Sequence, residues 1–354
     1  MNRQILKGAL LVAVAAFAPL FAPWQHGDAC TRVVYQAPDS TIITGRTMDW
    51  LEETGTDLWV FPRGMKRDGA SGPTSIKWVS KYGSLICSFY GIGSVDGMNE
   101  KGLVANVLYL AESEYPKPDG KRPTMSIAAW AQYVLDNHAS VSEVVNALRD
   151  DPFVVIAPEL PNGKRAAGHM AISDSTGDSA ILEYVRGKLV IHHGKEFPVL
   201  TNSPHFDEQL ALNAYWKQIG GMVFLPGTIR ASDRFARASF FIDAVPKTAD
   251  LFKGIASVFG VIRAVSVPLG ITTPGQPNLA STYWRTVSDH KNKVYYFDSA
   301  TSPTLFWVPL AELDLSEGAP VKKLTLQGGK TYSGSVASQL EPARPFEFLP
   351  ATVE

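Results

Sequence analysis

The stretch around Cys30 most constrains what this chain can become, because it combines a reactive side chain with a predicted β-hairpin. Segments 31–36 and 41–47 are both rich in β-branched residues, and the Ala-Pro-Asp-Ser sequence at 37–40 has turn chemistry. We therefore expect two antiparallel strands joined by a short turn, with Cys30 at the open end of the pair.

The register of this hairpin decides what faces the cysteine. A four-residue turn at 37–40 places Cys30 opposite Thr47 and one step from Arg46. Directly paired Cβ atoms lie roughly 4.5–5.5 Å apart. The turn alone is therefore expected to bring Arg46 and Asp49 close to the cysteine.

Residues 1–29 have the three parts of a secretory signal peptide. The segment starts with basic residues, continues with an apolar run over 9–21, and ends with Gly27 and Ala29 at the positions that a signal peptidase recognises. The apolar run falls short of the ~20 residues that span a bilayer. We expect cleavage after Ala29, export to the periplasm, no membrane attachment of the mature chain, and Cys30 as its first residue with a thiol and a free α-amine.

The same segment allows a second interpretation, since a cysteine directly after the cleavage site also marks a bacterial lipoprotein. That signal favours a leucine-like residue three places before the cysteine, where this chain has Gly27. The alternative function from another class is therefore a lipid-anchored binding protein in which Arg46 and Asp49 have only structural roles.

The composition is that of a globular enzyme. Hydrophobic residues make up 45% and charged residues 19%, and the formal net charge of −1 gives no reason to expect nucleic acid or an anionic membrane as a partner. No repeat or domain boundary is visible, so we expect one domain over 30–354 with a C-terminal tail. A disulfide between the two cysteines, Cys30 and Cys87, is possible, but Cys87 lies in an apolar run typical of a buried strand.

Metal and cofactor sites are not expected. The 7 histidines are scattered, and the adjacent His192 and His193 fall in an alternating segment that directs them to opposite faces. The Gly-Ile-Gly sequence at 91–93 lacks the third glycine and the helix of a nucleotide-binding loop.

Hydrophobic periodicity predicts an α+β fold of two antiparallel sheets with helices on their outer faces. A capping box at 140–143 predicts the start of one helix, and segment 95–102 is interpreted as a connection between strands. The remaining predicted strands are 58–61, 76–79, 85–91, 103–110, 169–173, 179–185, 188–192, 281–287, 293–298 and 304–308, and the predicted helices are 123–137, 206–218, 233–244 and 248–262.

Several motifs, taken in order, resemble the choloylglycine hydrolase family, which contains bile salt hydrolases and penicillin V acylases. These motifs are Cys30, Gly45-Arg46, Asp49-Trp50, the Asp-Gly-Met-Asn-Glu-Lys-Gly-Leu run at 96–103, Leu-Thr-Asn-Ser-Pro at 200–204 and Ser-Asp-Arg-Phe at 232–235. The resemblance implies an N-terminal-nucleophile hydrolase with an αββα four-layer sandwich. The export signal and the long connection at 264–280 are more similar to the Gram-negative branch than to the cytoplasmic Gram-positive one.

The resemblance also implies roles for single residues. Cys30 would be the nucleophile, Arg46 and Asp49 would lie beside its thiol and amine, Asn202 would contribute to the oxyanion hole, and Arg234 would steady the site. Tyr109 falls where penicillin V acylases have tyrosine and bile salt hydrolases usually have asparagine, and Trp50 would provide a second aromatic wall for the substrate.

Each of these residues also has a simpler interpretation from the sequence alone. Arg46 and Asp49 would form an ion pair at a strand end, and Asn202 before Ser-Pro would form a turn. Arg234 would be a solvated helix charge, while Trp50 and Tyr109 would be core aromatics.

The chemistry of an N-terminal cysteine does not depend on the resemblance. An α-amine has an ordinary pKa of ~7.7–8.0, so part of it is free to accept the thiol proton at neutral pH. Arg46 nearby would favour the thiolate.

The predicted function is hydrolysis of a small acyl amide through an acyl-cysteine intermediate, without a cofactor. Penicillin V and acyl homoserine lactones are the expected substrates, and conjugated bile salts are the alternative. By the resemblance, a homo-oligomer such as a tetramer is expected.

Overall fold

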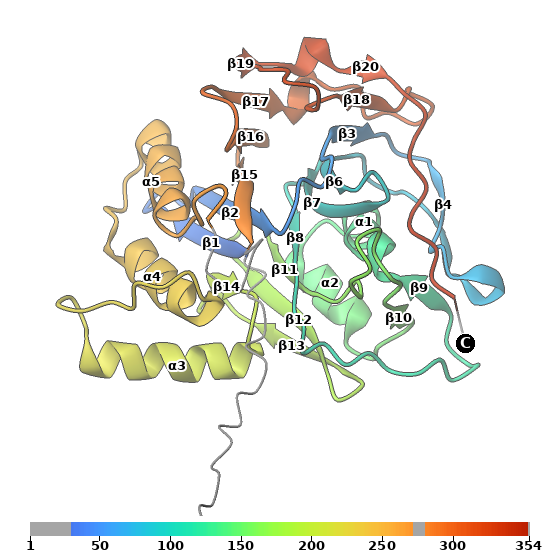
Figure 1. Cartoon of the computed structure of the whole chain (residues 1–354). Coiled ribbons are helices and arrows are strands. Elements are labelled where there is room, and N and C mark those ends of the chain that lie inside the picture. The colour runs from blue at the N-terminus through green and yellow to red at the C-terminus, as the bar shows by residue number, and fades with distance from the viewer. Residues whose placement is uncertain (1–29, 272–279, 353–354) are drawn as a thin grey trace, which may run out of the picture.

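Two large sheets face each other in the computed structural model, and helices cover both outer faces (Figure 1). The structure describes residues 30–271 and 280–352. The predicted signal peptide therefore lies outside the described residues, as does part of the predicted connection at 264–280. The four-layer αββα sandwich predicted from the sequence is confirmed.

Within the described residues, the first sheet has seven strands and the second has nine. The first runs in the order β14 (Val199–Thr201), β1 (Thr31–Gln36), β2 (Ile42–Trp50), β15 (Ser281–Asp289), β16 (Val294–Ser299), β17 (Leu305–Pro309) and β19 (Gly334–Ser335). The second runs in the order β13 (Lys188–His193), β12 (Ser179–Val185), β11 (His169–Ser173), β8 (Val104–Leu108), β7 (Gly93–Asn99), β6 (Ser84–Phe89), β3 (Leu58–Phe61), β18 (Lys322–Leu324) and β20 (Glu341–Pro342). Two strand pairs lie outside these sheets: β4 (Lys66–Asp68) with β5 (Lys77–Val79), and β9 (Thr124–Ser126) with β10 (Val154–Ile156).

The helices divide between the two outer faces. On the first sheet, α4 (Ala231–Ala244) packs on β1 and β14, α5 (Leu251–Ala264) packs on β1 and β2, and α3 (Phe206–Ile219) packs on α4. On the second sheet, α1 (Ile127–Asn137) packs on β7 and β8, and α2 (Val141–Leu148) packs on β12. None of the helices in the described ranges is long and apolar enough to cross a membrane.

The predicted capping box explains where α2 begins. The Ser140 side chain accepts a hydrogen bond from the Glu143 amide at 3.2 Å, and the Glu143 carboxylate accepts one from the Ala139 amide at 2.8 Å. Both contacts satisfy amides that have no partner within the helix.

The hairpin forms, but its predicted register is wrong by one residue. Thr31 pairs with Thr47, which leaves a loop of three residues rather than four. The Ala37 amide donates to the Thr41 carbonyl at 2.9 Å, and Ser40 takes a left-handed conformation with φ 63°. Three-residue hairpin loops commonly end in such a residue.

This shift changes the face that each side chain occupies, because side chains alternate along a strand. Cys30 shares its face with Arg46, toward the second sheet, while Thr47 and Asp49 point to the helices. The predicted register would have placed the thiol on the Asp49 side.

The sequence indicated that segment 95–102 connects two strands, and this prediction is wrong. The segment contains most of β7, inside the nine-stranded sheet. Glycine and asparagine are depleted in strands, so the pattern hides the strand. Gly97 is required by packing, since a Cβ there would lie 2.6 Å from the Leu85 carbonyl oxygen and from an Ile86 methyl group.

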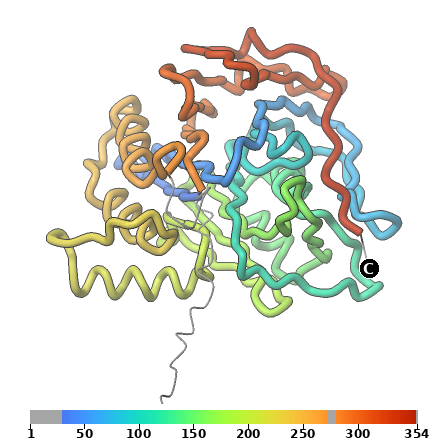
Figure 2. Tube along the Cα trace, in the orientation of Figure 1, coloured from blue at the N-terminus to red at the C-terminus, as the bar shows by residue number. Residues whose placement is uncertain are grey.

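The C-terminal tail belongs to the fold. Strand β18 pairs with β3 and with β20, and the chain then runs as an extended segment along the side of the second sheet (Figure 2). Cys87 is fully buried between the sheets, as predicted, and neither cysteine forms a disulfide.

Candidate active site

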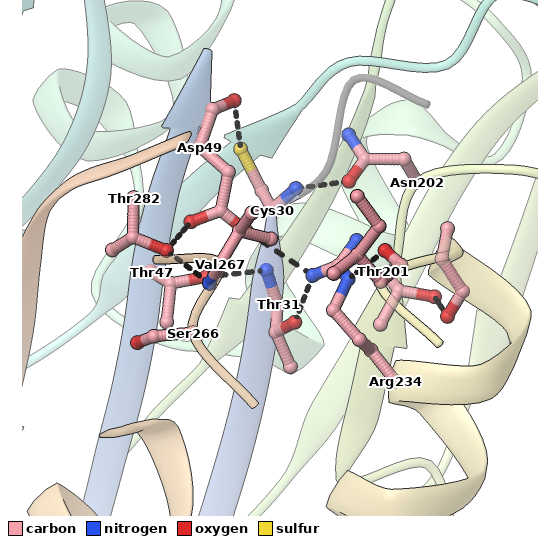
Figure 3. A network of polar contacts seen from close by, with 12 residues as sticks. Cys30, Thr31, Thr47, Asp49, Thr201, Asn202, Arg234, Ser266, Val267 and Thr282 are labelled. Carbon is pink, nitrogen blue, oxygen red and sulfur yellow. Dashed lines mark hydrogen bonds and ion pairs between the residues drawn. The ribbon is translucent and has the colours of Figure 1, made fainter. Parts of the chain in front are cut away.

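Cys30 directly precedes β1 and is 2% exposed. Its Sγ lies 3.7 Å from the Arg46 Nη2 and 3.7 Å from the Asp49 carbonyl oxygen (Figure 3 shows the second contact). The paired strands β1 and β2 thus bring together three residues that the sequence analysis singled out.

Asn202 follows β14, the strand that pairs with β1 on its other side. Its Oδ1 accepts a hydrogen bond from the backbone nitrogen of Cys30 (Figure 3). Its Nδ2 donates to the Tyr109 carbonyl at 2.5 Å. These two contacts fix the orientation of the amide. Because an amide nitrogen carries two hydrogens, the contact with Tyr109 leaves a second hydrogen on Nδ2. The role of this group toward an oxyanion stays a prediction.

Asp49 and Arg234 form a fully buried ion pair that joins β2 to α4. The Arg234 Nη1 lies 3.2 Å from the Asp49 Oδ2, and both side chains have no exposed surface. Thr282 on β15 donates to the other carboxylate oxygen, Oδ1, at 2.5 Å, and Thr47 donates to Oδ2 at 3.2 Å (Figure 3). The interpretation of Arg234 as a solvated charge is therefore wrong: helix α4 packs on β1 and β14 and carries it into the interior.

Burial has opposite effects on the two partners. It raises the pKa of Asp49, against the nearby charge of Arg234, and it lowers the pKa of Arg234. Arg234 also donates to the Thr31 hydroxyl at 2.6 Å, so the pair supports the residue next to Cys30.

Arg46 lies on the other face of β2, between the sheets. Its Nη2 donates to the Val107 carbonyl at 2.9 Å, its Nε lies 3.7 Å from the Asp96 Oδ2, and its guanidinium lies 4.6 Å from the Trp284 ring centroid. Asp96 in turn accepts from the Asn106 amide at 2.8 Å.

Sequence reasoning missed two of these supporting residues. Asp96 belongs to one of the motifs that carry the family resemblance, but the sequence analysis assigned it no role. Only its burial in the structure indicates that its carboxylate needs a charged partner. Thr282 gave no signal, because its partner Asp49 lies far away in the sequence.

The pKa of the Cys30 thiol is raised by burial, and the charge of Arg46 opposes that shift. The effect of Arg46 has the direction that the sequence analysis expected, but burial outweighs it. Burial thus disfavours the thiolate, and a base beside the sulfur would assist its attack.

A largely apolar pocket opens beside the thiol and holds about 630 Å³ of empty space, open solvent included. Trp50 and Tyr109 both line it, with ring centroids 5.3 Å apart in an edge-to-face arrangement. Lys164 lies above these two rings, with its Nζ 5.4 Å from the Trp50 centroid. The pocket lining consists of Cys30, Arg46, Met48, Trp50, Phe89, Ile92, Gly93, Ser94, Val95, Val107, Tyr109, Ile127, Ala128, Leu160, Ala166, Ala167 and Leu349.

The described residues offer no evident metal centre: across 30–271 and 280–352, no three His, Cys, Asp or Glu side chains gather as ligands would. His192 and His193 lie on opposite faces of β13 and face different carboxylates, Glu183 at 3.6 Å and Asp178 at 2.8 Å.

The family model described as linear amide C–N hydrolases of the choloylglycine hydrolase family matches residues 30–325. The chain belongs to this family. It is an enzyme that hydrolyses linear amide C–N bonds, and its matched segment begins at Cys30.

Similar proteins refine this assignment. The chain is 50% identical to a penicillin V acylase of Pectobacterium atrosepticum, over 90% of this chain and 92% of that protein. It is 29% identical to a bile salt hydrolase/transferase of Clostridium perfringens, over 76% and 89% of the two chains. The solved structure of penicillin V acylase from Agrobacterium tumefaciens is 57% identical in sequence and superposes with a TM-score of 0.85. The match covers 91% of this chain and 100% of that chain. The chain is a penicillin V acylase-like linear amide hydrolase.

Proposed function

We propose that this enzyme hydrolyses penicillin V through an acyl-cysteine intermediate on Cys30, and that it also cleaves acyl homoserine lactones. The observation that carries the proposal is the convergence on one residue of a thiol, a backbone nitrogen held by Asn202, and a neighbouring guanidinium from Arg46. All three meet at the apolar pocket.

Cleavage after Ala29 is the activation step in this proposal. Until then the nitrogen of Cys30 is part of a peptide bond and cannot accept a proton. The freed α-amine has an ordinary pKa of ~7.7–8.0, and Asn202 Oδ1 already accepts a hydrogen bond from this nitrogen. The amine can therefore remove the proton of the thiol.

Acylation follows from this proton transfer. The Sγ attacks the amide carbon, and the developing oxyanion takes a hydrogen bond from the second hydrogen on the Asn202 Nδ2. The α-ammonium then gives its proton to the leaving nitrogen, the C–N bond breaks, and the acyl group remains on sulfur as a thioester.

Deacylation reverses the roles. A water molecule gives a proton to the α-amine and attacks the thioester carbon, and the C–S bond breaks. The sulfur recovers the proton from the ammonium, and the carboxylic acid leaves.

The pocket walls support the choice of substrate. Trp50 and Tyr109 offer aromatic faces to a phenoxyacetyl group or to a flexible acyl chain. Aromatic pairs gain ~0.5–1.5 kcal/mol beyond burial, and a rigid steroid would gain less. The similarity to two penicillin V acylases supports the same choice.

A kinetic comparison of the mature enzyme tests the proposal. We expect higher kcat/KM for phenoxymethylpenicillin and for N-dodecanoyl homoserine lactone than for glycocholate. A preference for glycocholate would replace this assignment with conjugated bile salt hydrolysis. A version whose Ala29–Cys30 bond cannot be cleaved should be inactive.

Export to the periplasm is proposed from the signal sequence at 1–29. Fractionation of a cell that expresses the full chain tests it, and a diacylglyceryl group on Cys30 would support the lipid-anchored alternative. The predicted tetramer stays a prediction, which light scattering of the mature protein can test.

A further inference from the structure

One wall of the pocket comes from the C-terminal tail, outside the segment that the family model matches. That match ends at residue 325, whereas Leu349 lines the pocket that contains Cys30. The tail segment 343–352 therefore adds to the site something that the matched part of the chain does not supply.

Backbone hydrogen bonds fix Leu349 in place. Its amide donates to the Ile92 carbonyl at 2.8 Å, and its carbonyl accepts from the Ser126 hydroxyl at 2.7 Å. Two residues later, the Ala351 amide donates to the Ala70 carbonyl at 2.8 Å. Hydrogen bonds therefore hold the segment at the leucine and just after it, and the tail runs along the side of the second sheet (Figure 1).

Aromatic side chains before Leu349 anchor the segment further. Phe346 contacts Trp59 and Phe61 edge-to-face, with centroid distances of 5.3 and 5.7 Å. Phe348 is 9% exposed and packs against Phe346 at 5.7 Å. Such contacts make a fixed wall rather than a loose end.

The two hydrogen-bond partners of Leu349 belong to the pocket as well. Ile92 itself lines the pocket, and Ser126 directly precedes the lining residues Ile127 and Ala128 at the start of α1. Three distant segments thus meet in one wall: the turn before β7, the first turn of α1 and the tail.

We propose that Leu349 determines which acyl groups the pocket admits, and that the tail is a specificity element of this enzyme. The proposal rests on the proposed function, because it requires that the acyl group of the substrate enters this pocket. The half-buried leucine side chain would then contact the acyl chain and limit its length or width.

Opposite changes in side-chain volume test this role. Leu349→Ala enlarges the pocket, so the acyl length of maximal kcat/KM should increase. Leu349→Phe narrows it, so that optimum should move to shorter chains. A methylene that fits or fails to fit a hydrophobic pocket changes kcat/KM by roughly 10-fold or more. We expect a shift of that size in the ratio between long and short chains.

The experiment measures kcat/KM of the mature enzyme for a series of N-acyl-4-nitroanilides from butanoyl to dodecanoyl, with phenoxymethylpenicillin alongside. Glu347→Ala is the matched control, since this side chain is 91% exposed in the same segment. It should keep the wild-type length profile. Thermal unfolding of each variant reports whether it folds.

The outcomes separate the two claims. Opposite shifts for Leu349→Ala and Leu349→Phe support the specificity role, and a general loss of folding cannot produce them. If the enzyme hydrolyses phenoxymethylpenicillin but the two variants keep the wild-type profile, or shift it in the same direction, the role of Leu349 is overturned. The proposed function then stands. An enzyme that hydrolyses none of these amides overturns the proposed function and this inference with it.

Discussion

The two faces of strand β2 hold buried charges in different ways. On the helix side, the Asp49 carboxylate accepts hydrogen bonds from Thr47, Thr282 and Arg234. On the sheet side, the Arg46 guanidinium donates to the Val107 carbonyl. Among the contacts of the described residues, its Nε and Nη1 have no hydrogen-bond acceptor.

This difference indicates that the two faces have different roles: one positions the strands and helix around the site, and the other takes part in the reaction. The Asp49 carboxylate has hydrogen-bond donors from β2, β15 and α4 and fixes these elements, although the Arg234 Nη2 on the same face has no hydrogen-bond partner among the described residues. Arg46 has one carboxylate neighbour, Asp96 at 3.7 Å, but two of its nitrogens donate no hydrogen bond to any described residue. Unused donors on a buried guanidinium are costly, so Arg46 gains further when a negative charge forms on its Cys30 side. The Cys30 thiolate and the oxyanion of an attacked amide are such charges, so we assign the Asp49 face to geometry and the Arg46 face to reaction.

The largest expected effect comes from the thiol on which both faces converge. Cys30→Ala should lower kcat by on the order of 10³-fold or more, since loss of a nucleophile in other enzymes costs up to ~10⁶-fold. The fold should persist, because the side chain is small. Hydrolysis of phenoxymethylpenicillin and thermal unfolding are the two measurements. Cys87→Ala, at the other buried cysteine, is the control and should keep activity; near-wild-type turnover in Cys30→Ala would indicate another nucleophile.

Stability should depend on the Asp49 face. Asp49→Asn leaves the buried Arg234 charge uncompensated, and breaking such a pair costs about 3–5 kcal/mol of unfolding free energy. Denaturant titration measures this. A double-mutant cycle with Arg234→Met should show coupling between the two substitutions, and simple additivity would remove the ion pair from the account.

Reactivity should respond in opposite directions to changes on the two faces. Arg46 lowers the pKa of the Cys30 thiol and Asp49 raises it, although burial is the largest influence. Arg46→Gln should therefore move the pH midpoint of thiol alkylation upward, and Asp49→Asn should move it downward. Alkylation of Cys30 by iodoacetamide across a pH series, followed by mass spectrometry, gives both midpoints. If both substitutions moved the alkylation midpoint in the same direction, the opposite effects of the two faces on the thiol would be contradicted.

The smallest effect is expected at the pocket wall next to Asp49. Trp50→Ala removes the edge-to-face contact with Tyr109, and one such pair corresponds to ~0.5–1.5 kcal/mol, or roughly 2- to 12-fold. The preference for phenoxymethylpenicillin over glycocholate should narrow by that factor. An unchanged ratio of the two kcat/KM values would show that Trp50 does not select the substrate.

Sequence patterns predicted the layers of this fold because local signals mark them. Alternating strands and the capping box at 140–143 depend on neighbours a few residues apart, and these elements are present. The hairpin register was missed because it depends on whether Ser40 adopts a left-handed conformation. Strand β7 was missed because its glycines and polar residues are tolerated only between two neighbouring strands, a tertiary effect that outweighs propensity.

The candidate site divides in the same way. Cys30, Arg46 and Asp49 were placed together by one short hairpin, which a local pattern can predict. Thr282 and Leu349 approach the site from distant segments and give no local signal. The structure brings them in through sheet pairing and through the course of the tail.

The central claim is that Cys30 becomes the N-terminal residue and carries the acyl group. Intact and peptide mass spectrometry of the purified mature enzyme, quenched in acid during turnover of phenoxymethylpenicillin, tests it most directly. The account predicts a chain that begins at Cys30 and a phenoxyacetyl adduct on that residue alone. A fully active enzyme that retains Ala29, or an acyl group on any other residue, would contradict it.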